Sequence, residues 1–249
     1  MHVDWEEFKD LQLAFLKSST PDLEIPTDHG LLAALYNVAA ECNVKYIISG
    51  HNFITENITV PTWSHGHYDW RYVRLMQKRF GTRKLTSFPH LSMYALASQQ
   101  LFKGIKIIRI LNYVPEYDKK KIISFLEQEF GWQNYITKHA ESIYTFFVQA
   151  YILPTKFNYD KRKMHLSDLI CTGQMTRDEA LEILKKPLFT DSELKEMIEV
   201  VCKKFDITKE EFDAYMKLPN KSYYDYPSYE THSIYRVLRD IYKKIKPQI

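Results

Sequence analysis

The chain has 249 residues, of which 45% are hydrophobic and 26% charged, and its 34 basic and 31 acidic side chains leave a net charge of +3. This composition is typical of a globular protein and excludes an intrinsically disordered chain. No two of the seven glycines lie within ten residues of each other, so phosphate-binding loops built on clustered glycines, such as the Walker A loop and the dinucleotide fingerprint, are excluded.

Cysteine usage and the absence of long apolar runs predict the compartment. The three cysteines, Cys42, Cys171 and Cys202, form no Cys-x-x-Cys pair, which favours a reducing environment over a disulfide framework. The first residues are acidic and lack the apolar region of a signal peptide. The most apolar uncharged run, residues 142–155, is too short to cross a bilayer. We therefore expect a cytoplasmic protein with no membrane partner.

The first half of the chain predicts alternating helices and strands. Apolar residues at helical spacing predict a helix over 5–17, with Asp4 and Glu7 forming a capping box. A second helix over 28–42 is expected to bury one stripe, formed by Leu31, Leu35, Val38 and Ala39. The further elements expected up to residue 111 are strands over 44–49 and 105–111 and helices over 70–80 and 92–102. A helix followed by a buried strand is typical of a parallel α/β unit.

The second half predicts helices alone, over 118–130, 139–152, 164–172, 176–186, 190–204, 208–217 and 231–245. Thr-x-x-Glu capping boxes mark three of their starts, at Thr176, Thr190 and Thr208. We therefore predict an α/β fold in which residues 1–115 form a nucleotide-binding domain and residues 116–249 form a helical domain. Two strands are fewer than an open parallel sheet usually has, so the predicted sheet is incomplete.

The segment GHNFITE follows the first predicted strand and brings polar residues to the carboxyl end of the sheet, where open α/β sheets bind ligands. Gly50 would let a ligand approach the backbone, Asn52 could bond a base or ribose, and Glu56 could hold Mg²⁺ on a phosphate. The alternative is an ordinary turn, in which Asn52 and Thr55 satisfy local backbone groups.

Two further segments carry charged side chains that suit a phosphorylated ligand. Lys138, Glu141 and Thr145 would share one helical stripe, with Ile143, Phe146 and Phe147 facing the core. Residues 156–165 hold five cationic or titratable basic side chains and two aromatic ones, and Arg162 could grip a phosphate with two parallel hydrogen bonds. Solvated surface remains the alternative for both segments.

Two weaker patterns involve histidines and a basic stretch. His65 and His67, two residues apart, could share a side of an extended segment and ligate a metal. Residues 71–121 hold twelve Lys and Arg against two acidic residues, a distribution that suits either a solvated face or a surface that attracts phosphates or nucleic acid.

Taken in order, these segments resemble one family. The stretches VDWEEFKDLQLAFLKSSTPDLEIPTDHG, GHNFITE, KHAESIYTFFVQAYILPTKFNYDKRKMHLSDLI and GQMTRDEALEILKKP are similar to the N-acetyl sugar amidotransferases, PP-loop ATP pyrophosphatases of bacterial surface-polysaccharide synthesis. The resemblance runs from about Val3 to Tyr226. The family's Ser-Gly-Gly-x-Asp-Ser loop and its zinc-ribbon cysteine pairs, which precede these segments, have no counterpart in this sequence, which suggests a truncated or split member.

The resemblance implies an ATP- and Mg²⁺-dependent reaction in lipopolysaccharide or exopolysaccharide biosynthesis. The amide oxygen of a sugar acetamido group is adenylated, and ammonia then displaces AMP to leave an acetamidino group. It further implies a nucleotide-sugar substrate and a separate glutaminase-type subunit that supplies ammonia; homo-oligomerisation is left open.

Residue by residue, the resemblance assigns two sets of positions. The first set belongs to the nucleotide site: Gly50, Asn52, Thr55 and Glu56, with Glu56 also holding the metal ion. The second set would contact the nucleotide-sugar or pyrophosphate: Asp28, Lys138, His139, Glu141, Asp160, Lys161, Arg162 and His165. The alternatives are a tRNA-modifying PP-loop ATPase, which the basic stretch favours, and a non-catalytic or split subunit that needs a partner chain.

Overall fold

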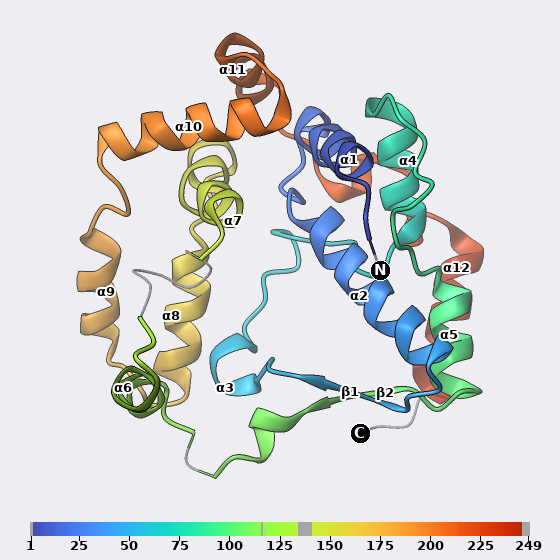
Figure 1. The fold of residues 1–249 in the computed structure, drawn as a ribbon, viewed down its shortest axis with the longest axis horizontal. Coiled ribbons are helices and arrows are strands. Elements are labelled where there is room, and N and C mark those ends of the chain that lie inside the picture. Colours follow the sequence, from blue (N-terminus) through green and yellow to red (C-terminus); the bar gives the residue numbers. More distant parts are fainter. Residues whose placement is uncertain (1, 116, 134–140, 246–249) are drawn as a thin grey trace. The chain divides into compact units, whose positions relative to one another are not determined.

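The computed structural model describes residues 2–115, 117–133 and 141–245 and is mostly helical (Figure 1). The elements of its first half are α1 (Trp5–Ser18), α2 (Ile25–Glu41), β1 (Tyr46–Ser49), α3 (Phe53–Glu56), α4 (Trp70–Phe80), α5 (Met93–Leu101), β2 (Lys106–Arg109) and a 3₁₀ turn (Ile110–Tyr113). The second half contains α6 (Lys119–Phe130), α7 (Ile143–Phe147), a π-helix (Val148–Phe157), α8 (Lys161–Cys171), α9 (Arg177–Lys185), α10 (Asp191–Phe205), α11 (Lys209–Lys217), a 3₁₀ turn (Tyr223–Asp225) and α12 (Ser233–Ile245).

The two strands β1 and β2 lie side by side and run in the same direction (Figure 1). The N–H of Lys106 donates to the carbonyl of Lys45 at 2.8 Å, just before β1 begins. Ile47 of β1 is buried, whereas Tyr46 and Ile48 on either side of it are exposed. An α/β fold with a small parallel sheet and a helical C-terminal part, as the sequence predicts, is thus confirmed.

Internal contacts divide the chain into two compact units, both discontinuous in sequence. Unit 1 consists of Met1–Ile47, Pro61–Ile108 and Glu210–Ile249, and unit 2 of Ile48–Val60 and Arg109–Lys209. The C-terminal residues therefore pack with the N-terminal helices. The sequence predicts a boundary at residue 115 that divides the chain by function into a nucleotide-binding and a helical domain. That division stays a prediction.

The C-terminal Tyr-rich segment completes the core of unit 1. The hydroxyl of Tyr226 donates to the carbonyl of Ser18 at 2.7 Å, and that of Tyr223 donates to Oδ2 of Asp69 at 2.6 Å. Both tyrosines are buried in one cluster with Leu11, Phe15, Ile25, Tyr72, Val73, Met76 and Phe88. Burial raises the pKa of Asp69 even though Tyr223 and two backbone N–H groups donate to it. The sequence indicates a loop at this Tyr-rich segment. Because Tyr223 and Tyr226 are buried, the loop forms part of the core.

Glu7 of α1 anchors the segment 86–88. Its carboxylate accepts the N–H groups of Thr86, Ser87 and Phe88 at 2.9, 2.8 and 3.1 Å, together with the Thr86 hydroxyl. Asp4 caps α1 as predicted, by accepting the N–H of Glu7 at 3.0 Å. The predicted capping box is wrong in its other half, because the Glu7 carboxylate turns to residues 86–88 and the Asp4 N–H donates to the Ser87 hydroxyl instead.

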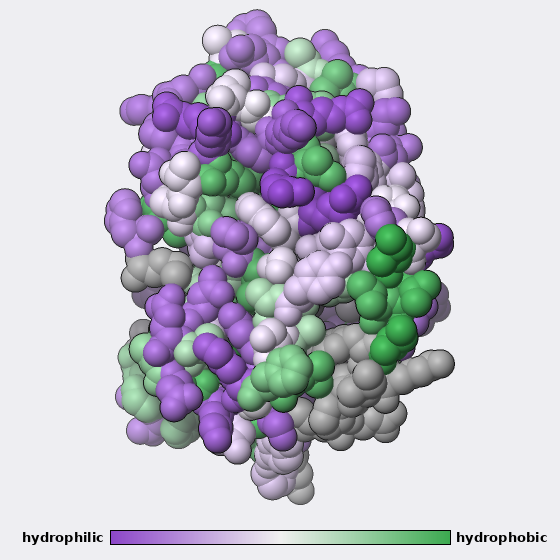
Figure 2. Space-filling view, turned by 90° about the vertical axis from the view of Figure 1, so that its right-hand side faces the viewer, coloured by the Kyte–Doolittle hydropathy of each residue, from purple (hydrophilic) through white to green (hydrophobic). Residues whose placement is uncertain are grey.

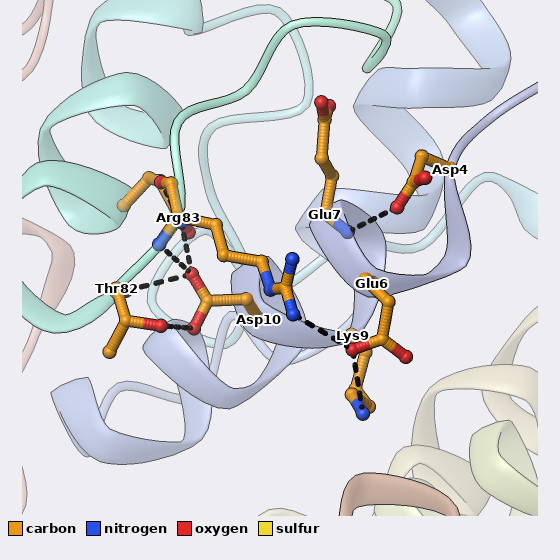
Figure 3. Close-up of polar contacts among 8 residues, drawn as sticks. Asp4, Glu6, Glu7, Lys9, Asp10, Thr82 and Arg83 are labelled. Atoms are coloured by element: carbon orange, nitrogen blue, oxygen red, sulfur yellow. Dashed lines mark hydrogen bonds and ion pairs between the residues drawn. The ribbon is translucent and has the colours of Figure 1, made fainter.

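Asp10, one turn further along α1, holds the preceding part of the same loop (Figure 3). Its carboxylate accepts the N–H groups of Thr82 and Arg83, both at 2.8 Å, and the Thr82 hydroxyl at 2.9 Å. Burial alone would raise the pKa of Asp10, but these hydrogen bonds stabilise the charged form and leave its pKa below the ordinary value. Two carboxylates on one helical face thus fix the connection between α4 and α5.

The buried side of α2 differs from the predicted one. Leu31, Leu35 and Val38, expected to face inward, are 61%, 52% and 42% exposed. The helix instead buries a stripe with smaller and aromatic members, Ala33, Tyr36 and Ala39, the last of which was predicted correctly. Small side chains let α2 approach the sheet closely, so packing overrides the hydrophobicity ranking that favours the leucines. The helix also begins earlier than predicted, at Ile25, with Pro26 in its first turn, where a missing N–H costs nothing.

His29 lies fully buried in α2. Its Nδ1 lies 2.8 Å from the carbonyl of His67, and the N–H of Leu91 donates to its Nε2 at 3.3 Å. These partners require a neutral ring that carries its proton on Nδ1. The ring stacks on Trp70 with centroids 5.6 Å apart. Burial chiefly lowers its pKa from 6.5 to about 4.

The buried neutral His29 makes stability depend on pH. Between pH 6.5 and about 4, the unfolded chain binds a proton that the folded chain does not, so the free energy of unfolding falls as pH falls through this window, by up to about 3 kcal/mol. Urea unfolding at pH 7, 5.5 and 4.5 measures the slope. His29→Gln should remove most of it while lowering stability at pH 7, whereas exposed His51→Gln should leave it unchanged. Equal slopes in all three proteins would contradict the assignment.

The predicted helix over 139–152 is corrected in its described part. Ser142 caps α7 by accepting the N–H of Thr145 at 3.3 Å, so the helix begins at Ile143 and continues as a π-helix. Glu141 precedes the cap, and the predicted stripe that joins it to Thr145 is wrong; Lys138 lies outside the described residues. Phe147 is buried as expected, whereas Ile143 is exposed. The capping boxes at Thr176 and Thr190 are confirmed.

Candidate functional site

The GHNFITE segment forms the loop after β1 and the short helix α3, in unit 2. Asn52 caps this helix: its Oδ1 accepts the N–H of Thr55 at 2.9 Å and the Thr55 hydroxyl at 3.1 Å. The N–H of Phe53 donates to the side chain of Asn112 at 2.9 Å. Asn52 thus satisfies a local backbone group, as the alternative of an ordinary turn predicts, and Thr55 bonds to the Asn52 side chain; both residues are buried. The same bonds fix Thr55 in one position.

Glu56 and Gly50 occupy the edge of this segment. A carboxylate oxygen of Glu56 lies 3.4 Å from Nε2 of His51. Tyr117 lies near enough that its pKa is raised, first by burial and then by the Glu56 charge. A Cβ added to Gly50 would meet no atom within 4 Å. The backbone there is open to a ligand, and Glu56 offers a carboxylate beside it.

Asp168 of α8 holds the end of α3 in place. This carboxylate is 2% exposed, and its Oδ1 accepts the N–H groups of Asn57 and Ile58 at 3.1 and 2.8 Å. These groups lie at the C-terminal end of α3, so Asp168 fixes the GHNFITE segment against α8. Asp168 was not singled out from the sequence. The available signal was an acidic residue among the apolar residues of the stretch KMHLSDLI.

A pocket of about 300 Å³ lies in unit 2 where α3, α6, α8 and the end of α9 meet. Its polar lining comes from five residues: Thr55, Lys119, Arg162, His165 and Lys186. Its apolar lining comes from Leu166, Leu169, Ile183, Pro187 and Leu188. This combination of an apolar wall with a few convergent polar groups is typical of small-molecule sites. The pocket brings together Thr55, Arg162 and His165, which the sequence predicted from two distant segments.

Arg162 is held rigidly at the pocket wall. Its Nε donates to Oδ1 of Asp160 at 3.0 Å and its Nη2 to Oδ2 of Asp160 at 2.8 Å, while its Nη1 donates to the carbonyl of Lys186 at 3.0 Å. Asp160 also caps α8 by accepting the N–H of Arg162. The predicted residues Asp160 and Arg162 therefore form one pair that links the start of α8 to the end of α9, with Lys161 between them in the first turn.

The pocket lining is cationic. Lys119, Arg162 and Lys186 line it, and no carboxylate is among its lining residues. The N–H of Lys119 donates to the side chain of Gln174 at 3.0 Å, which ties the start of α6 to the α8–α9 connection. Lys156, which precedes α8 in the sequence, is not one of the lining residues. Its burial lowers the pKa of its ammonium group. Lys119 and Lys186 were missed by sequence reasoning, because only the packing of three helices brings them to one point.

The remaining predicted residues lie elsewhere. Asp28 belongs to α2 in unit 1, where its carboxylate lies 3.2 Å from Nε2 of His67. Glu141 lies exposed in the turn before α7. Lys138 and His139 fall outside the described residues, so their roles stay predictions.

The histidine pair offers no metal site in the described chain. His67 pairs with Asp28, and the ring of His65 lies against Tyr223 with centroids 3.8 Å apart. Within residues 2–115, 117–133 and 141–245, no three His, Cys, Asp or Glu side chains group as metal ligands would. Mg²⁺ bound through substrate phosphates needs only one or two protein carboxylates, so Glu56 still suits that role.

None of the helices in the described part of the chain combines the length and the hydrophobicity that a bilayer crossing demands.

The comparisons relate the second half of the chain to polysaccharide synthesis. No curated protein and no solved structure gives a match. Residues 141–242 match the family model described as "LPS biosynthesis protein WbpG-like, C-terminal domain". This stretch contains eight of the ten residues that line the pocket, on α8, on α9 and in the segment that follows α9. The matched region thus indicates a protein of lipopolysaccharide biosynthesis.

Proposed function

We propose that this chain takes part in the ATP-dependent conversion of a sugar acetamido group to an acetamidino group, in the synthesis of a lipopolysaccharide sugar. The observation that carries the proposal is the cationic pocket, where Thr55 meets Arg162 and His165. These residues come from the segments that resemble the amidotransferases, and most of the lining lies in the region matched to a lipopolysaccharide family.

The pocket suits the diphosphate of a nucleotide-sugar. Lys119 and Lys186 would neutralise the phosphates, and Arg162, whose charge Asp160 already balances, would add N–H donors to them. Asp160 and the Lys186 carbonyl hold the Arg162 guanidinium in one orientation, so little side-chain entropy is lost on binding. The apolar wall formed by α8 and α9 would cover the nucleoside or sugar and exclude water.

We place ATP beside this pocket, on the loop that holds Gly50 and Glu56. Gly50 leaves room for a phosphate or ribose close to the backbone, and Glu56 would hold Mg²⁺. ATP supplies the adenylyl group that turns a poorly reactive amide into a good electrophile. The chain's own task is to hold the acetamido group near that loop and keep water away. Asp168, by fixing α3 to α8, sets the distance between the two subsites.

Product formation tests the proposed reaction. The chain is mixed with ATP, Mg²⁺, UDP-N-acetylglucosamine and ¹⁵N-ammonium, with and without a polypeptide that carries the Ser-Gly-Gly-x-Asp-Ser loop. AMP and a ¹⁵N-labelled sugar should form together when the loop polypeptide is present, and weakly or not at all without it. The absence of AMP from the complete mixture contradicts the proposal.

A second candidate is a subunit that depends on a partner chain. The exposed apolar stripe of α2, formed by Leu31, Leu35 and Val38, and the exposed Tyr46 of β1 favour it, since parallel strands are normally covered on both faces. Light scattering combined with the AMP assay distinguishes the two candidates. Both should form a complex with the loop polypeptide, but a non-catalytic subunit should release no AMP in that complex, whereas the proposed enzyme should release it.

A further inference from the structure

An apolar stripe runs along the outer side of α12, in unit 1. Its members are Ile234, Val237, Leu238 and Ile241, which recur at helical spacing and are 62%, 59%, 38% and 48% exposed. Figure 2 shows the side of the molecule on which α12 lies in Figure 1, and strongly hydrophobic residues gather at the right-hand edge of this face. Four aliphatic side chains aligned in water on one helix mark an interaction surface.

A different side of α12 attaches the helix to unit 1. The ring of Tyr235 lies 4.6 Å from that of Tyr229 and 5.8 Å from that of Tyr94, measured between centroids. The Arg71 guanidinium carbon lies 6.0 Å from the same ring. Successive helical residues are about 100° apart, so Tyr235 turns toward the core while Ile234 and its partners do not. The stripe is thus not the packing face of the helix.

The charge of α12 identifies the partner. The sequence Ser233–Ile245 contains four basic residues and one acidic residue, an excess of three positive charges. Exposed Arg236 lies about 200° around the helix from Ile234, on the side opposite the stripe. A helix with a cationic face and an aliphatic stripe is typical of segments that lie in the surface of an anionic bilayer.

We propose that α12 binds the surface of an anionic phospholipid membrane, with Ile234, Val237, Leu238 and Ile241 inserted among the lipids. The helix would lie in the membrane plane, since 13 residues span about 20 Å and the hydrocarbon core is about 30 Å thick. This proposal departs from the prediction of no membrane partner, which rested on the lack of a spanning segment. A peripheral helix needs no such segment.

Vesicle flotation with the full chain tests the proposal. The chain is mixed with phosphatidylcholine vesicles, or with vesicles that also contain phosphatidylglycerol, at low and high salt. Binding to the anionic vesicles should be at least about tenfold tighter than to the neutral ones and should weaken as salt rises. Equal binding to both lipids, or binding to neither, overturns the proposal.

Matched variants assign the binding to α12. Val237→Asp combined with Ile241→Asp should reduce binding by at least about tenfold, and Arg236→Glu should reduce it for anionic vesicles alone. Leu31→Asp, at an equally exposed apolar position on α2, should bind as the unaltered chain does. Circular dichroism should show all variants folded, since each position is exposed. Membrane binding retained by the double variant overturns the proposal. A dimer that light scattering detects for the unaltered chain but not for the double variant also overturns it, because the stripe would then join two copies of the chain.

Discussion

Replacing Glu7 with alanine should lower the free energy of unfolding by about 3–5 kcal/mol. The substitution leaves the N–H groups of Thr86, Ser87 and Phe88 without their acceptor. Burial alone would raise the pKa of Glu7, but these bonds outweigh it and lower the pKa to about 2. Urea denaturation followed by tryptophan fluorescence at pH 7 measures the change.

Glu6 provides the matched control for Glu7. It lies one residue away on α1, is partly exposed and pairs with Lys9 at 3.1 Å and Arg83 at 3.3 Å (Figure 3). Glu6→Ala should lower the free energy of unfolding by less than about 1 kcal/mol. The pKa of Glu7 is lower in the folded chain, so its contribution is fully present above pH 4.5 and is lost as pH falls toward 2. Similar losses for both variants at pH 7 would contradict the role assigned to Glu7.

Replacing Asp168 with alanine should have the second large effect, on both stability and ligand binding. Oδ1 of Asp168 accepts two backbone N–H groups at the end of α3, and their loss should cost about 3 kcal/mol. Because α3 carries Thr55 into the pocket, nucleotide-sugar affinity should also fall about tenfold or more. Urea unfolding and isothermal titration calorimetry measure the two effects.

Asp168→Asn separates the hydrogen bonds from the charge. Both N–H groups donate to Oδ1, and Oδ2 is buried without a hydrogen-bond partner in the described chain. An asparagine that keeps its oxygen toward Asn57 and Ile58 should therefore retain more stability and affinity than alanine does. If Asp168→Asn and Asp168→Ala lose the same stability and the same affinity, these two hydrogen bonds do not position α3.

Most of the helices and both strands could be predicted from the sequence, because caps and hydrophobic spacing are local signals, whereas α3 and the π-helix were not predicted. The buried side of α2 could not, because the packing of α2 against Ile47, Leu91 and Ile105 buries Ala33 and Tyr36 and leaves the more hydrophobic Leu31 and Leu35 exposed. The role of Glu7 was likewise hidden. A carboxylate in the first turn of a helix suits a capping box, and only the tertiary fold brings residues 86–88 to it.

The candidate site was predictable in part for a similar reason. Thr55, Arg162 and His165 lie in segments whose residue types indicate phosphate chemistry, and the structure places them around one pocket. Lys119 and Lys186 resemble any other surface lysine in sequence. Their place in the site depends on how α6 and α9 pack against α8, which no local pattern encodes.

Nucleotide-sugar binding to the unaltered chain and to two lysine variants tests the central claim most directly. UDP-N-acetylglucosamine is titrated into the unaltered chain, Lys186→Glu and Lys185→Glu, with calorimetric detection. Lys186 lines the pocket, whereas Lys185 is exposed and pairs with Glu182 at 2.6 Å. The ligand should bind the unaltered chain and the Lys185 variant alike, and the Lys186 variant at least about tenfold more weakly. Equal affinity in all three proteins, or no binding to the unaltered chain, would contradict the assignment of this pocket to the nucleotide-sugar.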